Sequence, residues 1–337
     1  MPLATSAALF DWAERVSALA RAATPFFLLI DFEGRRPRLF TAADWESRKL
    51  HFDFPARQDP HGGETSGTRP VHLTAQPPRP DAYRAAFERV QAGLRRGDSF
   101  LTNLTFASPV ELRGTLLQVY RQTEAKYRVH LPGEFTCFSP ETFVSITADG
   151  YLETRPMKGT AADTPAGRAA LLSSRKEIAE HATIVDLLRN DLSQVARRVR
   201  VTDYRYLRTI ASARGGLVQT SSRIGGQLPE DWRASLGQTL LRLLPAGSVS
   251  GAPKPATLEL IHSVEQGPRG YYCGVAGYYD GHTLDSCVLI RMIVRRPTGA
   301  YYFHSGGGVT ALSDWREEYD ELISKIRLPL YLARPPR

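Results

Sequence analysis

The chain has 337 residues, 42% of them hydrophobic, and carries a formal net charge of +8. This length can bury a substantial core, as one large domain or two modest ones. No run of eighteen apolar residues occurs, which argues against a transmembrane helix. No basic run interleaved with aromatic residues occurs either, so the surplus charge suits a small anionic substrate better than a nucleic acid.

Two further features bear on the compartment. The N-terminal stretch 1–23 has an early acidic residue and no basic segment, so it predicts an amphipathic helix and not a signal peptide. Cys137, Cys273 and Cys287 are scattered without metal-site spacing, which fits a reducing environment. We therefore expect a cytoplasmic protein with no membrane partner.

The N-terminal region predicts a small unit. Apolar runs on both sides of Glu33-Gly34-Arg35 predict a β-hairpin after the first helix. Residues 55–80 are rich in Pro, Gly and polar residues and predict an irregular connection. We assign residues 1–80 to a helix and hairpin region that belongs to the same domain as a core at 81–330.

Strands and helices are intermixed through the rest of the chain. Helices are predicted at 81–96, 231–244, 256–265 and 314–327, and strands at 99–112, 135–154, 199–210, 217–228, 271–280, 284–296 and 300–309. No repeat and no regular βαβ period appears. This pattern favours a single α+β domain over a doubly wound sheet.

The stretch 153–196 is the one around which we expect the chain to be organised. Pro156 and Gly159 predict a turn around Lys158, because proline fixes φ and glycine relaxes it. Thr164-Pro165 then predicts the start of one long helix, with a hydroxyl N-cap and a proline at the first helical position. Its apolar face is predicted to comprise Ile178, Val185, Leu188 and Leu192.

Two pairs of glutamates share one spacing. Glu177 and Glu180 project from one side of the long helix, and Glu318 and Glu321 repeat this spacing on the last helix. Taken singly, such a pair is usually a solvated helix face. Two pairs together indicate a site for Mg²⁺, which takes oxygen ligands and keeps several waters, whereas His181 alone gives little support for zinc.

Two glycine-rich segments and one arginine are candidates for anion binding. Gly306-Gly307-Gly308 lets backbone amides approach an anion, although a flexible turn is an equally simple reading. The segment 247–254 contains Ser250 but lacks the Gly-Lys-Ser/Thr ending of a nucleotide loop, so we reject nucleotide binding. Arg269 can pair bidentately with a carboxylate, although an isolated loop arginine is usually only surface.

Together these segments resemble the chorismate-utilising enzymes that include anthranilate synthase component I, and most closely the aminodeoxychorismate (para-aminobenzoate) synthase component I type. Five segments match in the family's order: SPETF (139–143), ETRPMKGT (153–160), KEIAEHATIVDLLRNDL (176–192), the segment 243–280 and HSGGGVTALSDWREEYDELISK (304–325). The resemblance implies a single domain in which two large, mostly antiparallel sheets stack with helices outside. It makes 81–330 the chorismate-binding core.

The resemblance also implies roles for residues. Mg²⁺ would be held directly by Glu180 and Glu321, with Glu177 and Glu318 acting through water. The substrate-binding set comprises Arg269, Tyr272, Gly306, Gly307, Gly308, Lys325, Thr160 and Ser250. Arg269 and Tyr272 would meet the enolpyruvyl carboxylate of chorismate, and Lys325 would lie near its ring carboxylate.

Lys158 decides between members of the family. Relatives resembling anthranilate or isochorismate synthase typically carry alanine there, whereas aminodeoxychorismate synthases carry lysine. The neutral amine can add to ring C2 as the C4 hydroxyl leaves, after which ammonia adds at C4 and expels the lysine. Glu141 is implied as the acid and base at the C4 oxygen.

Two positions depart from the family pattern. Leu101 stands where many relatives have Gln or Lys, which argues against the water-activating isochorismate and salicylate synthases. Gln219 stands where relatives often have His, and a neutral amide cannot serve as a general acid.

We therefore expect amination of chorismate, in folate synthesis, with ammonia from a separate glutamine amidotransferase subunit. The alternatives are anthranilate synthase component I and a chorismate-binding protein without catalytic activity.

Overall fold

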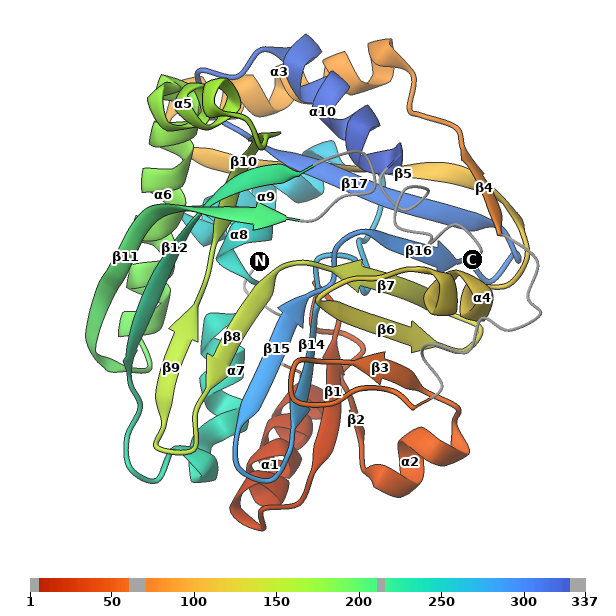
Figure 1. Ribbon diagram of the computed structural model, residues 1–337, viewed down its shortest axis with the longest axis vertical. Coiled ribbons are helices and arrows are strands. Elements are labelled where there is room, and N and C mark those ends of the chain that lie inside the picture. Colours follow the sequence, from red (N-terminus) through yellow and green to blue (C-terminus); the bar gives the residue numbers. More distant parts are fainter. Residues whose placement is uncertain (1–5, 61–70, 211–215, 328–337) are drawn as a thin grey trace.

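The computed structural model describes residues 6–60, 71–210 and 216–327. Two large antiparallel sheets stack face to face, and helices lie outside them (Figure 1). The first sheet contains β1 (Phe26–Ile30), β2 (Arg38–Phe40), β8 (Thr142–Ile146), β9 (Tyr151–Thr154), β10 (Met157–Ala162), β11 (Arg197–Ile210), β12 (Leu217–Gln227), β14 (Val275–Tyr279) and β15 (Leu284–Val288). The second contains β3 (His51–Asp53), β4 (His72–Ala75), β5 (Leu101–Arg113), β6 (Tyr127–Leu131), β7 (Phe135–Ser139), β13 (Gly251–Ala252), β16 (Met292–Arg295) and β17 (Tyr301–Val309). This α+β architecture confirms the predicted fold class.

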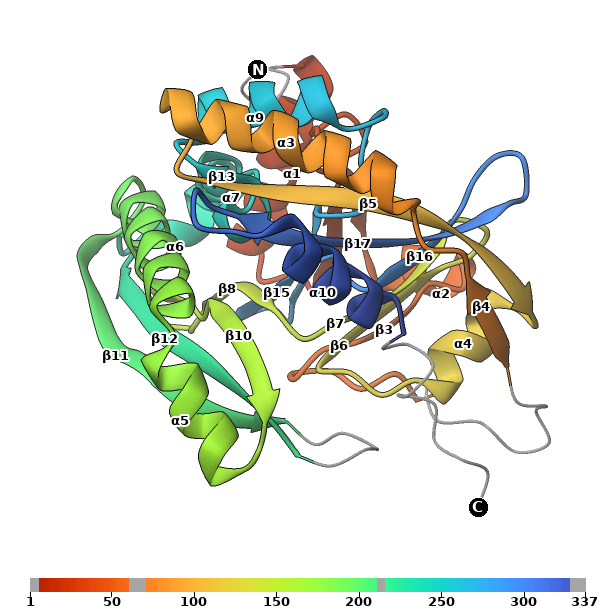
Figure 2. The ribbon, with the colours of Figure 1, turned by 90° about the horizontal axis from the view of Figure 1, so that it is seen from above.

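The helices cover the outer faces of the sheets and one edge. They are α1 (Ala7–Arg21), α2 (Ala42–Ser47), α3 (Pro80–Arg96), α4 (Leu116–Gln122), α5 (Pro165–Ser173), α6 (Arg175–Ser193), the 3₁₀ turn η1 (Trp232–Ser235), α7 (Leu236–Leu243), α8 (Gly247–Ser250), α9 (Lys254–Val264) and α10 (Trp315–Arg327). Seen from above, α3 and α9 lie over β5, whereas α5 and α6 flank β10, β11 and β12 (Figure 2). None of the helices in the described part of the chain is long and apolar enough to cross a membrane.

The core has two parts. The larger fills the space between the sheets and under α1 and α7, and includes fully buried rings such as Phe27, Phe52 and Trp232. The smaller lies under α3, α9 and α10 on the second sheet, around Phe303 and Leu322. Burial of apolar surface at about 25 cal/mol per Å² is what holds these layers together.

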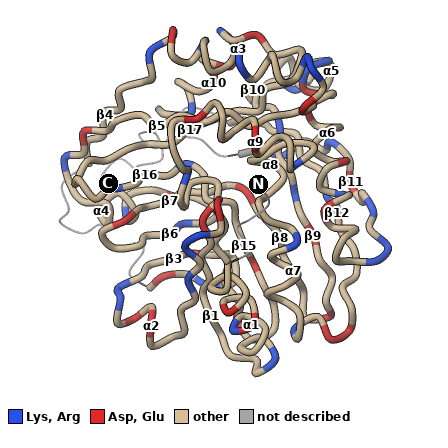
Figure 3. Tube along the Cα trace, turned by 180° about the vertical axis from the view of Figure 1, so that it is seen from behind, with Lys and Arg blue, Asp and Glu red and all other residues tan. Residues whose placement is uncertain are grey.

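The sheet edge formed by β11 is strongly basic. Among the charged positions of β11, Arg outnumbers Asp, and Figure 3 shows blue stretches along this strand. Strand β11 pairs with β12 through three register irregularities, and Arg198 and Arg205 adopt positive φ. Bulges and charge on an edge strand oppose pairing with another chain.

The long helix predicted from Thr164 is two helices. Ser174 has an extended backbone between α5 and α6, and its hydroxyl accepts a hydrogen bond from the Glu177 amide, so it is the N-cap of α6. The predicted apolar face is also wrong at one position, because Ile178 is exposed whereas Val185, Leu188 and Leu192 are buried.

Other local predictions need correction as well. Lys158 is not in a turn but in β10, where pairing with β12 imposes an extended backbone and a bulge lies at Gly159. Gly306-Gly307-Gly308 belongs to the strand predicted at 300–309 and is not the alternative turn, because all three residues pair with β5 as part of β17. The stretch expected to be irregular contains β4, which pairs with β5, while residues 61–70 of it lie outside the described residues.

Candidate active site

The lysine of β10 reaches across to the glycines of β17. Lys158 Nζ lies 3.7 Å from Glu180 Oε2 of α6. A Cβ on Gly308 would lie only 2.8 Å from the same Nζ, and one on Gly307 would lie 3.3 Å from Glu318 Oε2. Strand β17 therefore needs glycine here because the lysine of one sheet and a glutamate of α10 pass close over its backbone.

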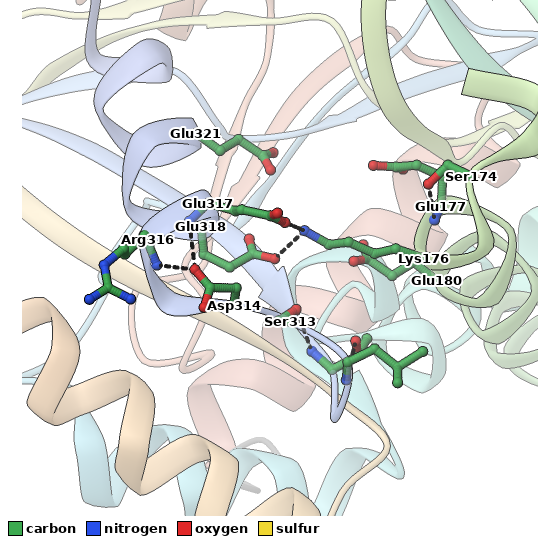
Figure 4. Close-up of polar contacts among 12 residues, drawn as sticks. Ser174, Lys176, Glu177, Glu180, Ser313, Asp314, Arg316, Glu317, Glu318 and Glu321 are labelled. Atoms are coloured by element: carbon green, nitrogen blue, oxygen red, sulfur yellow. Dashed lines mark hydrogen bonds and ion pairs between the residues drawn. The ribbon is translucent and has the colours of Figure 1, made fainter. Parts of the chain in front are cut away.

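The two glutamate pairs face each other across the gap between α6 and α10 (Figure 4). Glu180 and Glu318 are 6% and 3% exposed, so both belong to the interior. Lys176, one residue before Glu177, lies between the two helices, with its Nζ 2.8 Å from Glu318 Oε1. The structure thus brings all four predicted glutamates to one place, together with a second lysine that the sequence analysis did not assign.

Burial dominates the electrostatics of the α6 pair. It raises the pKa of Glu180 to about 7, with Lys158 opposing the shift and Glu318 and Glu177 adding to it. It also raises the pKa of Glu177, and the charge of Glu321 adds to that shift. These mutual effects show that carboxylates on two helices far apart in sequence share one electrostatic environment.

Glu321 behaves differently from its neighbours. Burial would raise its pKa, but the charge and hydrogen bond of Lys325 outweigh burial, and the pKa is lowered. Lys325 Nζ lies 2.8 Å from Glu321 Oε1 and donates to the carbonyl of Gly306, also at 2.8 Å. Lys325 therefore ties α10 to the glycine strand beside the carboxylates.

The donor chemistry of this gap fits a hard divalent cation. All four side chains offer oxygen, and Glu180 Oε1 is buried without a hydrogen-bond partner. Glu318 Oε1 meets Lys176 only as an ion pair, without the angle of a hydrogen bond. Within the described ranges no three acidic, His or Cys side chains converge as ready metal ligands, so these glutamates would have to draw together around an ion.

Glu141 directly precedes β8, and the charge of Lys158 acts on its carboxyl group. Burial raises its pKa, which favours the protonated acid. The groups that oppose this shift are the Ser248 hydroxyl and the charges of Lys158, Arg291 and Lys325. Glu141 is thus a carboxyl group able to hold a proton beside the lysine amine.

Arg269 is not available to a substrate carboxylate, which corrects our expectation. Its guanidinium is buried and pairs with both oxygens of Glu265, at 2.8 and 2.6 Å. It also donates to the carbonyls of Val249 at 2.7 Å and Asn103 at 2.6 Å. With its donors so occupied, Arg269 joins α9 to β5 and holds the loop before β14.

Arg291 takes its place as the candidate cation. It precedes β16 with φ of 55°, and burial lowers the pKa of its guanidinium while the charge of Glu141 opposes that shift. No hydrogen bond from the Arg291 side chain to another described residue contributes to its pKa. The sequence signal that was missed is an arginine directly after the apolar strand of 284–290, where a charge is out of place unless it faces a polar site.

Three other residues predicted to bind substrate differ in burial and in their contacts. Tyr272 is buried, with its ring 4.9 Å from that of His304. Thr160 is exposed and accepts a hydrogen bond from Gln219 Nε2 at 2.8 Å. Ser250 is fully buried and donates to the carbonyl of Ala246 at 3.0 Å, so its hydroxyl serves helix α8.

The two departures from the family pattern are placed differently relative to the lysine. Leu101 is buried, and its Cδ1 would lie 3.1 Å from a Cβ on Gly308, the same point that Lys158 Nζ approaches. Gln219 pairs with Thr160 across β10 and β12, and its Oε1 is buried without a hydrogen-bond partner. Leu101 thus lies close to the Lys158 amine, whereas Gln219 pairs two residues further along β10 and Thr220 is the residue opposite Lys158.

This fold and this arrangement of carboxylates, lysine and glycines place the chain among the chorismate-binding enzymes, a family whose model matches residues 8–331. The chain is 44% identical to an uncharacterised PabA-like protein of Pasteurella multocida, over 91% of this chain and 94% of that one. It is 32% identical to aminodeoxychorismate synthase component 1 of Salmonella typhimurium over 74% of this chain, and spans 57% of that enzyme. The structure of anthranilate synthase component I from Streptococcus pneumoniae superposes with a TM-score of 0.67 at 27% identity, over 81% of this chain and 62% of that one.

Proposed function

We propose that the chain is an aminodeoxychorismate synthase component I, which aminates chorismate at C4 to give 4-amino-4-deoxychorismate. The observation that carries the proposal is the position of the Lys158 amine, which passes close to Gly308 and lies 3.7 Å from Glu180 Oε2. Anthranilate and isochorismate synthases resemble this chain in the same segment but typically carry alanine there, so they have no amine to offer.

In the first half of the reaction, the neutral Lys158 amine adds to ring C2 of chorismate and the C4–O bond breaks. Glu141 gives its proton to the departing oxygen, which leaves as water, and the raised pKa of Glu141 supports this role as an acid. The adduct nitrogen stays protonated as a secondary ammonium, so that it can leave as the neutral amine in the second half.

In the second half, ammonia adds at C4, the C2–N bond breaks, and the electron pair returns to the lysine nitrogen. The Glu141 carboxylate takes a proton from the new C4 ammonium group. The sum is chorismate and ammonia giving 4-amino-4-deoxychorismate and water. A glutamine amidotransferase partner would supply the ammonia, in the para-aminobenzoate branch of folate synthesis.

Mg²⁺ is the cofactor this proposal requires, held by Glu180 and Glu321, with Glu177 and Glu318 assisting. When bound, it would supply positive charge for the ring carboxylate of chorismate and for the departing oxygen. Arg291 is the group best placed to meet the second carboxylate, because its charge faces Glu141 and no side-chain hydrogen bond to a described residue contributes to its pKa.

The test is product analysis with the purified chain, chorismate, Mg²⁺ and ammonium. We expect 4-amino-4-deoxychorismate by mass spectrometry and, without ammonium, a gain in protein mass equal to chorismate less water. Lys158→Ala should lose both, whereas Lys49→Ala, at an exposed lysine, should retain both. Anthranilate fluorescence from the wild type, or unchanged amination by Lys158→Ala, would defeat the proposal.

A further inference from the structure

Lys176 makes the ion pairs that join α6 to α10 in the described part of the chain. Its Nζ lies 2.8 Å from Glu318 Oε1 and 3.6 Å from Glu317 Oε2. The two partners differ sharply in exposure, since the Glu318 side chain is 2% exposed and that of Glu317 is 69% exposed. The ammonium therefore stands between an interior carboxylate and one in solvent (Figure 4).

The interior partner depends on this ammonium. Glu318 is almost fully buried, and a buried carboxylate without a counter-charge is costly. The charges of Glu180 and Glu321 also act on Lys176, so the ammonium lies within the field of the carboxylates from both helices. The Lys176 ammonium thus lies among the carboxylates between which a divalent ion would bind.

The charge balance of the gap cannot accommodate both cations in the same place. With every group in its charged form, four glutamates against Lys158, Lys176 and Lys325 leave one net negative charge, and a divalent ion would reverse the sign. A Lys side chain is long and flexible, and 24% of this one is already exposed. Glu317 lies within reach of the same ammonium on its solvent side.

We infer that Lys176 is a tethered counter-ion of the metal site: it pairs with Glu318 when Mg²⁺ is absent and moves outward to Glu317 when Mg²⁺ binds. Glu317 is then the alternative ion-pair partner of Lys176, and it favours metal binding without contacting the metal. This inference rests on the Mg²⁺ site of the proposed function, but it assigns Lys176 and Glu317 a role in loading the metal and not in the reaction.

The first test is calorimetric titration of the metal-free protein with Mg²⁺ alone. Glu317→Gln removes the alternative ion-pair partner of Lys176 and should weaken Mg²⁺ binding by about fivefold, a typical coupling between two linked sites. Asp320→Asn is the matched control, because it removes an exposed charge from the same helix without contacting Lys176, and it should change the affinity less than about twofold. Equal effects of the two variants would overturn the inference.

The second test follows the ammonium itself. Acetylation of Lys176, measured by mass spectrometry with exposed Lys49 as internal reference, should be slow in the metal-free protein and several-fold faster at saturating Mg²⁺. Unchanged or slower labelling with Mg²⁺ bound would overturn the inference and leave the proposed function standing. If the wild type binds no Mg²⁺ at all, the metal site of the proposed function fails, and this inference fails with it.

Discussion

The two ends of helix α6 hold buried charge in opposite ways. At its C-terminal end, Asp191 Oδ2 lies 2.8 Å from Lys254 Nζ, which also donates to the carbonyl of Leu243 at 2.9 Å. At its N-terminal end, Glu180 Oε2 meets Lys158 only at 3.7 Å, and Oε1 is buried without a hydrogen-bond partner. The first arrangement is complete within the protein, and the second is not.

This difference indicates that the Asp191–Lys254 pair positions α6, whereas the carboxylates at the other end of the helix are available for binding. Burial raises the pKa of Asp191 and lowers that of Lys254, so desolvation outweighs their attraction and the pair adds little net stability. What the pair does is fix α6 to the start of α9, directly after the strand β13 that pairs with β5. With its C-terminal end fixed in this way, α6 presents at its N-terminal end carboxylates such as Glu180, one oxygen of which has no hydrogen-bond partner.

Breaking the completed pair should have the largest effect on stability. Lys254→Met leaves Asp191 buried without its counter-charge, and we expect the free energy of unfolding to fall by about 3–5 kcal/mol. Urea denaturation at pH 7.5 measures this change. Replacing the exposed Arg84, whose partner is Glu88, should cost less than about 1 kcal/mol.

The double variant Asp191→Leu/Lys254→Met sharpens the point. Two apolar side chains of similar volume should recover most of the lost stability, since a buried ion pair contributes little beyond an apolar pair. A double variant as unstable as the single one would show that the ion pair itself stabilises the fold, and the contrast between the two ends of α6 would disappear.

At the N-terminal end of α6, removing a buried charge should raise the free energy of unfolding instead of lowering it. The pKa of Glu180 is raised to about 7, so in EDTA its contribution to stability is present below its unfolded value of 4.5 and is lost as pH rises through 7. Glu180→Gln should flatten this dependence and raise stability at pH 8 by about 2 kcal/mol, while amination falls at least about a hundredfold. Exposed Glu46→Gln should change neither quantity. Denaturation in EDTA at pH 5 and pH 8, with rates at saturating Mg²⁺, gives both readouts.

Local patterns predicted much of this site. The spacing of three between Glu177 and Glu180, and between Glu318 and Glu321, placed each pair on one helix face, and the structure shows both pairs facing one gap. The helix around them was mispredicted although a signal existed. Thr164 caps α5 as predicted, and Ser174 followed three residues later by Glu177 is the pattern of a second helix N-terminus, that of α6.

The misplaced arginine has a different cause. Arg269 lies in the loop between α9 and β14, and Arg291 lies between β15 and β16, directly after an apolar run. What decides is tertiary: Glu265 and two backbone carbonyls occupy Arg269, whereas Arg291 faces Glu141. The glycines of β17 lie in the strand predicted at 300–309, and their local sequence also permits a turn as a second interpretation, because their strand conformation depends on pairing with β5, just over two hundred residues away in sequence.

The smallest expected effect on stability is that of removing the N-cap of α6. Ser174→Ala removes the side chain that accepts from the Glu177 amide at 3.3 Å, and should lower the free energy of unfolding by about 1 kcal/mol. Thr115→Ala removes an equivalent cap from α4, far from the glutamates, and should cost a similar amount. Only Ser174→Ala should speed hydrogen exchange at residues 176–178 and weaken Mg²⁺ binding, because Lys176 and Glu177 lie in the turn that frays. Equal Mg²⁺ affinity in the two variants would mean that the first turn of α6 does not need to be ordered before the metal binds, and that the carboxylates are organised by the ion and not by the helix.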